Sequence, residues 1–248
     1  MSREGDAAEA VARLDQITRR LRRECPWDRE QDERSIVSHT VEAAYELADA
    51  ATQGDDAKLL DELGDVLFQV HFLALLLEER DAGSLAEVAE TITEKLVRRH
   101  PHVFGERSVA AGTVGEAGSS GQVLANWDRI KREVEGRGAD DPFADVPENL
   151  PGPLYARKLL RRGASAGIAG PAPDARVALA RASAAIGSLE ARARGATASP
   201  DAPPGDRDDV ERELGEALLA LVDAARILRA DPELALRAAA DRLRDPSA

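Results

Sequence analysis

The sequence is poor in aromatic residues and nearly free of cysteine. Aromatic side chains make up 3% of its 248 residues, and Cys25 is the one cysteine. A single cysteine excludes an internal disulfide framework and a cysteine-based zinc site. Scarce aromatics beside abundant alanine and leucine favour a helical protein whose core is built from small side chains.

Long apolar segments are missing as well. No apolar run approaches the roughly 20 residues that a membrane-spanning helix needs. The first ten residues, MSREGDAAEA, hold no apolar signal-peptide core. We therefore expect a soluble, cytoplasmic protein without a membrane partner.

Positive charge is in deficit. The chain has 33 Lys and Arg residues against 46 Asp and Glu residues, so its net charge is −13. This balance gives no indication of a nucleic-acid partner. Neither a G-x-x-x-x-G-K-[ST] loop nor a G-x-G-x-x-G motif occurs, which argues against P-loop and Rossmann nucleotide binding.

Apolar residues recur at helical spacing through most of the chain, which predicts an all-α fold. The helices expected in the first half cover residues 7–23, 36–52, 57–79, 84–99 and 122–135. Pro26 is expected to end the first helix, and Asp32 or Ser35 to cap the second. Ser84 and Glu87 form a capping-box pattern at the start of the fourth.

A Pro/Gly-rich stretch over residues 137–153 is the predicted linker between two domains, residues 1–136 and 154–248. A second stretch rich in Pro, Gly and Asp, residues 193–209, is expected to be disordered.

The second half repeats the first in degenerate form. Residues 212–222 (RELGEALLALV) resemble residues 61–71 (DELGDVLFQVH), and residues 182–189 resemble residues 40–47. The repeat predicts tandem helical domains, of which the second has kept its packing and lost most of its polar chemistry.

Four carboxylates form the most informative pattern. Glu42 and Glu46 are four residues apart on one predicted helix, and Glu62 and Asp65 are three apart on the next. Each spacing places a pair on one helix face, and antiparallel packing would gather all four. Close like charges cannot all stay ionised, so a hard divalent cation would stabilise them: Mg²⁺, with Mn²⁺ as the alternative. The competing interpretation is a solvated acidic face, although Glu62 and Asp65 interrupt the most apolar helix.

A basic cluster closes the helix expected over residues 84–99. Lys95, Arg98 and Arg99 lie in its last turns, where cations favourably meet the helix dipole. The functional alternative is a phosphate clamp, because Arg offers a bidentate fork and Lys a point charge. Both interpretations stay open.

The two tryptophans also allow two interpretations. Trp27 and Trp127 could each fill the core or provide a platform for a nucleobase. Lys131 follows Trp127 by four residues, which would place a cation beside a stacked base.

Four sequence blocks follow one another over about residues 10–135. They are CPWDREQDERSIVSHTVEAAYELADA, LLDELGDVLFQVHFLALLLEE, EKLVRRHPHVFG and VLANWDRIKREVE. Together they resemble the MazG family of nucleoside triphosphate pyrophosphohydrolases. The degenerate second half is also similar to this family, whose longer members carry two tandem MazG domains.

The resemblance implies an all-α, four-helix-type domain that forms a homodimer. It also implies Mg²⁺-dependent hydrolysis of NTPs or dNTPs to the monophosphate and pyrophosphate, with removal of non-canonical nucleotides as a compatible role. The family's metal signature is E-E-x-x-E followed by E-x-x-D. It matches the metal-binding and catalytic candidates Glu42, Glu46, Glu62 and Asp65.

One position departs from the family signature. Its second glutamate, a metal ligand in the family, is Ala43 here. The family's substrate-binding blocks match the remaining candidates: Trp27, Lys95, Arg98, Arg99, Trp127 and Lys131.

Ala43 and the eroded repeat motivate a different functional class, a nucleotide-binding or scaffold dimer with attenuated catalysis. A third interpretation is an acidic helical interaction module.

Overall fold

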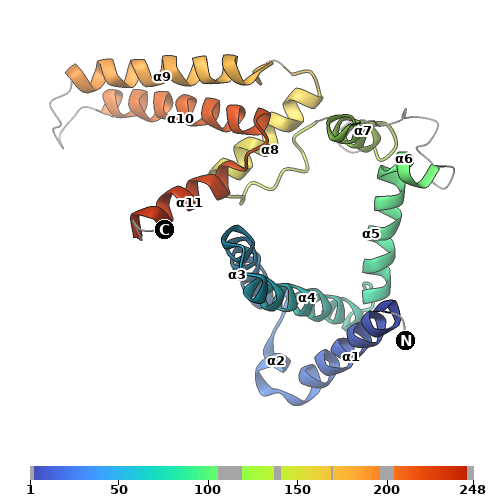
Figure 1. Cartoon of the computed structure of the whole chain (residues 1–248). Coiled ribbons are helices and arrows are strands. Elements are labelled where there is room, and N and C mark those ends of the chain that lie inside the picture. Colours follow the sequence, from blue (N-terminus) through green and yellow to red (C-terminus); the bar gives the residue numbers. More distant parts are fainter. Residues whose placement is uncertain (1–2, 106–118, 137–140, 169, 196–203, 245–248) are drawn as a thin grey trace. The chain divides into compact units, whose positions relative to one another are not determined.

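The computed structural model describes residues 3–105, 119–136, 141–168, 170–195 and 204–244. Within these ranges the chain forms eleven α-helices and no strand (Figure 1). The expectation of an all-α protein is therefore confirmed. None of the described helices is both long and apolar enough to cross a membrane.

The chain divides into two compact units, Met1–Arg98 and Arg99–Ala248. This division falls at the end of the fifth helix. The domain boundary at residues 137–153 stays a prediction.

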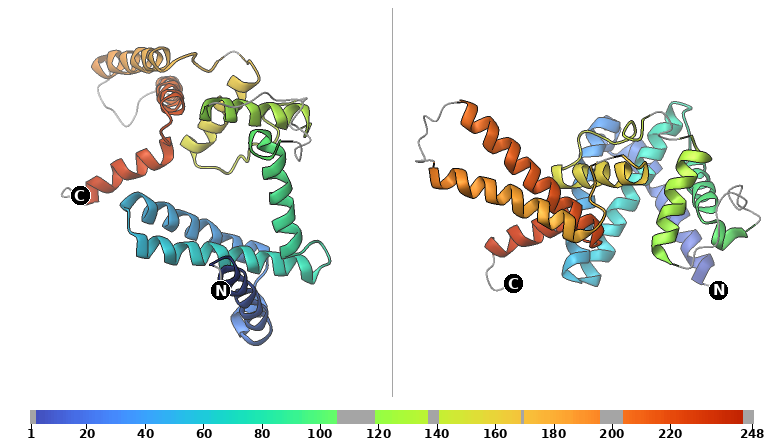
Figure 2. Two further views of the ribbon diagram at one scale, coloured as in Figure 1. Left: turned by 45° about the vertical axis from the view of Figure 1, so that its right-hand side comes forward. Right: turned by 90° about the horizontal axis from the view of Figure 1, so that it is seen from above.

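The first unit is organised around an antiparallel helix pair. Its elements are α1 (Arg3–Glu24), α2 (Pro26–Glu30), α3 (Glu33–Gln53), α4 (Asp56–Glu79) and α5 (Leu85–Arg99), whose last residue begins the second unit. Figures 1 and 2 show α3 and α4 lying side by side along most of their length. Gly54 ends α3 in the left-handed conformation, with φ at 71°, and Asp55 accepts hydrogen bonds from the first amides of α4.

The helix boundaries follow the capping residues. Asp32 and Ser35 form a reciprocal capping box at α3. At α5 the Glu87 amide donates to the Ser84 hydroxyl over 3.2 Å. Pro26 lies at the first position of α2, directly after the end of α1. These local signals explain why the expected helices occur.

The core of the α3–α4 pair lies at the start of α3 and the end of α4. Ile36, Phe72 and Leu76 are buried, and Phe68 and Leu73 pack against them. Antiparallel packing then places the second half of α3 beside the first half of α4, where the acidic pairs lie.

Helix α1 is held on α4 by ion pairs. Arg19 binds Glu78 through two nitrogens at 2.9 and 2.6 Å, and Arg22 binds Glu79 through two bonds of 2.8 Å. The Arg19 guanidinium holds the pKa of Glu78 below its usual value. Bidentate pairs of this kind fix orientation as well as contact.

The second unit contains a second antiparallel pair. Its helices are α6 (Pro101–Phe104), α7 (Ser120–Glu133), α8 (Gly152–Ser165), α9 (Ala175–Gly195), α10 (Pro204–Ile227) and α11 (Pro232–Arg244). Helices α9 and α10 run side by side (Figures 1 and 2), and α8 packs against α10. Ala172, Ala178 and Ala224 form a buried cluster of small side chains.

Two Pro/Gly-rich segments contain more structure than their composition indicates. Helix α9 continues to Gly195 and α10 begins at Pro204, so the disorder expected over residues 193–209 was wrong at both ends, and residues 196–203 lie outside the described part. Proline fits the first turn of α10 because its missing amide has no partner there. In the predicted linker, Val146 is buried, and the carbonyl of Pro142 accepts from Arg162 at 2.9 Å; this stretch packs on α8.

Candidate active site

The four predicted carboxylates lie on the facing helices α3 and α4. Glu42 and Glu46 on α3 are exposed, and so is Asp65 on α4. Glu62 differs, because only 8% of it is exposed. A carboxylate buried in the middle of an apolar helix needs compensation from a cation, a hydrogen bond or a proton.

The charges around Glu62 do not balance the negative charge of its carboxylate. Burial raises the pKa of Glu62, and the nearby charges of Glu46 and Asp65 raise it further. Lys58 opposes this shift, but its ammonium is bound to Asp49 at 3.0 Å. That hydrogen bond raises the pKa of Lys58 and lowers the pKa of Asp49. The site therefore carries excess negative charge beside a lysine that is already paired.

A divalent cation would neutralise this excess negative charge. Carboxylate oxygens are the hard ligands that Mg²⁺ prefers, and the raised pKa of Glu62 marks a place where positive charge would be stabilising. The side chains of Glu46, Glu62 and Asp65 fit such an ion in their chemistry. Across the described residues, however, no three Asp, Glu, His or Cys side chains already converge on one metal position, so the acids would have to close around it.

Position 43 lies inside the helix pair. Ala43 is 5% exposed and lies one turn before Glu46 on α3. On the facing helix, Gln69 is buried and follows Glu62 and Asp65 along the same face. Its carbonyl oxygen has no hydrogen-bond partner among the described residues. The acidic face of α4 is therefore continued by a buried polar group at the same helical spacing.

Trp27 lies beside His39, which precedes Glu42 by three residues on α3. Its ring meets the ring of His39 edge-on, with centroids 5.8 Å apart, and His39 Nδ1 is 3.7 Å from Glu42 Oε2. Trp27 is 49% exposed, so its ring is open to a ligand rather than filling the core. His39 is not among the candidates from the sequence, although its spacing of three from Glu42 was an available signal.

The basic candidates separate into two environments. Lys95 and Arg98 lie in the last turns of α5, and both are partly buried. Arg99 is bound to Glu135 through two nitrogens, at 3.0 and 2.6 Å, and 12% and 7% of the two side chains are exposed. The structure therefore commits Arg99 to an ion pair, and its part in a phosphate clamp stays a prediction.

Trp127 on α7 packs against a histidine. Its ring and that of His100 meet edge-on with centroids 5.0 Å apart. The indole N–H is buried and has no hydrogen-bond partner among the described groups. The side chain of Lys131 lies outside the described part, so the base-and-phosphate pairing of Trp127 with Lys131 stays a prediction.

Fold and site define a class of protein: an all-helical chain with E-x-x-x-E and E-x-x-D pairs on adjacent antiparallel helices. The model of the MazG nucleotide pyrophosphohydrolase domain matches residues 31–104, which span both pairs.

Similar proteins extend this match along the chain. A nucleoside triphosphate pyrophosphohydrolase of Escherichia coli K12 is 35% identical over 240 residues, covering 94% of this chain and 83% of the relative. A nucleoside triphosphate pyrophosphohydrolase/pyrophosphatase MazG of Thermotoga maritima is 31% identical over 215 residues, covering 87% and 74%. A nucleoside triphosphate pyrophosphohydrolase of Mycobacterium tuberculosis is 34% identical over 162 residues, covering 64% and 45%.

The chain therefore belongs to the MazG family of nucleoside triphosphate pyrophosphohydrolases, which are hydrolases of phosphoric anhydride bonds.

Proposed function

We propose that this protein hydrolyses nucleoside triphosphates to the monophosphate and pyrophosphate with Mg²⁺, or alternatively Mn²⁺, at the acidic pairs of α3 and α4. The observation that carries the proposal is the buried carboxylate of Glu62, whose pKa is raised by burial and by Glu46. Glu46, Glu62 and Asp65 would hold the cation, and Glu42 would ligate it or polarise the attacking water. When bound, the ion supplies charge neutralisation for the triphosphate and orients the water.

The other side chains would position the substrate. Trp27 with His39 offers an exposed aromatic surface for a base, next to Glu42. Lys95 and Arg98 would bind phosphate oxygens from the end of α5. The same roles for Arg99, Trp127 and Lys131 rest on the resemblance to the family.

A homodimer is part of the proposal. One face of α4 presents a stripe of exposed apolar side chains at helical spacing: Leu60, Leu63, Leu67 and Val70. On α3, Val37 and Val41 are exposed as well. A second copy would bury both surfaces and complete a four-helix arrangement. We further propose that the protein is cytoplasmic. Removal of non-canonical nucleotides is one role that is compatible with the proposed reaction.

The test is pyrophosphate release from a panel of NTPs and dNTPs with Mg²⁺. Glu62→Gln and Asp65→Asn should each lower kcat/KM by at least about 100-fold, because each removes a charged metal ligand. Asp56→Asn is the matched control, since Asp56 is an exposed acid at the start of the same helix. Unchanged rates in both site variants would refute the site. A protein that neither binds Mg²⁺ nor turns over any nucleotide would instead be the attenuated scaffold.

A further inference from the structure

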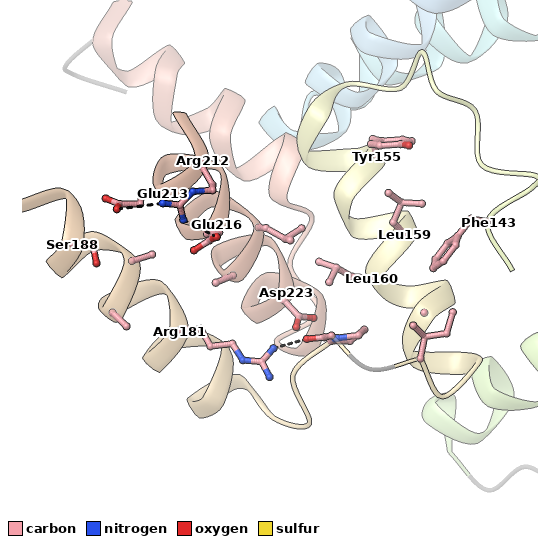
Figure 3. Close-up of a pocket in the computed structure, with 18 residues that line it drawn as sticks. Phe143, Tyr155, Leu159, Leu160, Arg181, Ser188, Arg212, Glu213, Glu216 and Asp223 are labelled. Atoms are coloured by element: carbon pink, nitrogen blue, oxygen red, sulfur yellow. Dashed lines mark hydrogen bonds and ion pairs between the residues drawn. The ribbon is translucent and has the colours of Figure 1, made fainter. Parts of the chain in front are cut away.

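The second unit contains a large cavity for which the proposed reaction has no use. It is open to the surface and has a volume of about 870 Å³ between helix α8 and the α9–α10 pair, a size typical of small-molecule sites. Figure 3 shows Tyr155, Leu159 and Phe143 on one side of it. The polar side chains Arg181, Ser188, Arg212, Glu213 and Glu216 lie across from them on α9 and α10.

The cavity is lined by the repeat positions that form the acidic site of the first unit. The repeat aligns residues 182–189 with 40–47 and residues 212–222 with 61–71. Ala184 and Ser188 then stand in the places of Glu42 and Glu46, and both line the cavity. Glu213 and Glu216 stand in the places of Glu62 and Asp65, and both line it too. The cavity of the second unit therefore lies between the repeat helices that correspond to α3 and α4, and its lining has a different chemistry.

This second site is not built for a metal-bound triphosphate. Helix α9 contributes no carboxylate to the cavity. Of the three from α10, Glu213 and Glu216 lie 3.8 and 3.4 Å from nitrogens of Arg212, and Asp223 is paired with Arg226. The guanidinium of Arg212, which also pairs with Asp209 at 3.2 Å, already supplies positive charge beside Glu213 and Glu216. These carboxylates therefore need no metal ion to balance their charge.

The remaining polar groups suit a ligand with one anionic end. Arg181 uses an N–H to donate to the carbonyl of Gly170, which leaves most of its five donors for an anion. Asp223 does not oppose it, because its carboxylate accepts from the Ala172 amide at 2.5 Å and pairs with Arg226. At the other end, the carboxylates of Glu213 and Glu216 can accept from hydroxyl or amino groups.

We propose that this cavity binds a nucleoside monophosphate, without a metal and without hydrolysing it. The phosphate lies at Arg181, the base lies against the wall formed by Phe143 and Tyr155, and the carboxylates of α10 accept from the sugar or base. The choice of this ligand rests on the proposed function, because the monophosphate is the product that the first unit would release.

The test is equilibrium dialysis of the full chain against AMP, GMP, CMP and UMP in excess EDTA, with wild type and Glu62→Gln in parallel. We expect about one monophosphate bound per chain in both proteins for at least one base. Arg181→Ala should weaken this binding at least about tenfold, whereas Arg176→Ala, an exposed arginine on the same helix that does not line the cavity, should not.

A second pair of variants tests whether the ligand occupies the cavity. Ala184 is exposed, so Ala184→Trp fills the cavity without entering the α9–α10 contact and should abolish binding; Ser183→Trp, on a neighbouring exposed position, should not. The proposal is wrong if no monophosphate binds in EDTA, if inorganic phosphate binds equally well, or if Ala184→Trp acts only by changing the oligomeric state. Dialysis needs no turnover, so a failed pyrophosphate assay leaves this result independent.

Discussion

At the scale of single residues, the acidic site is set by what surrounds one buried carboxylate. Glu62 is desolvated and faces like charge, while Lys58 is engaged by Asp49. Ala43 contributes only a methyl group to the same helix contact. A glutamate there would add a fifth carboxylate to a cluster that is already short of positive charge, so the alanine reduces repulsion in the absence of a cation.

Ala43→Glu should therefore lower the free energy of unfolding in EDTA by about 1–3 kcal/mol, because a larger, charged side chain must fit into a buried position. Saturating Mg²⁺ should recover part of this loss if the new carboxylate joins the metal ligands. Chemical denaturation with EDTA or with Mg²⁺ measures both effects. Ala44→Glu is the control, since Ala44 is the exposed neighbour. Equal stability of the two variants in EDTA would contradict the buried placement of residue 43.

At the scale of elements, the end of α5 shows how one basic cluster can serve two purposes. Its last turn carries cations where the helix dipole favours them. Arg99 goes further and forms a nearly buried, two-bond ion pair with Glu135, just after α7. A buried charge whose partner is removed is strongly destabilising, so this pair fixes the end of α5 whatever Arg99 does for a substrate.

Arg99→Met should lower the free energy of unfolding by about 3 kcal/mol, because it removes the two-bond cationic partner of the nearly buried Glu135 carboxylate. Glu135→Gln should also destabilise the protein, and it does so without touching a predicted phosphate ligand. Comparing urea unfolding with kcat/KM for both variants separates the two roles. If Arg99→Met lowers activity and leaves stability unchanged, the ion pair does not support the fold.

At the scale of the whole molecule, the chain is two helical units that each expose apolar surface on an antiparallel pair. In the first unit this is the α4 stripe already described; in the second, Leu214, Leu218 and Leu221 of α10 are exposed. Apolar surface of this extent on a helix is typical of a contact with another chain.

A charge placed in the α4 stripe should dissociate the proposed dimer. Leu63→Glu with Leu67→Glu should raise the dimer dissociation constant by at least about a hundredfold, equivalent to ~2.8 kcal/mol, because the carboxylates would be buried between two copies. Light scattering after size-exclusion chromatography measures the molar mass. Leu243→Glu, at an 85% exposed position on α11, is the control. A wild-type protein that stays monomeric at high concentration would refute the dimer.

Local signals in the sequence were sufficient for much of the fold. The caps at Asp32 and Ser84 and the proline at position 26 act within a few residues, so the boundaries of the first-unit helices could be predicted. The facing of Glu46 and Glu62 followed from spacing and antiparallel packing. The pairing of Arg99 with Glu135, the contact of Trp27 with His39 and the cavity of the second unit depend on long-range packing, which no local pattern specifies.

In the first unit, the side chain of Arg22 connects two separate elements. Its guanidinium binds Glu79 at the end of α4 through two hydrogen bonds. It also donates to the carbonyls of Asp28 and Gln31, at 2.5 and 3.0 Å. These carbonyls lie at the end of α2, the short helix that carries Trp27. One side chain thus pins the tryptophan-bearing turn to the helix that carries Glu62. A lysine could not hold both sides at once, since it lacks the planar fork. Arg22 therefore couples the position of the exposed Trp27 ring to the helix that carries the acidic residues Glu62 and Asp65.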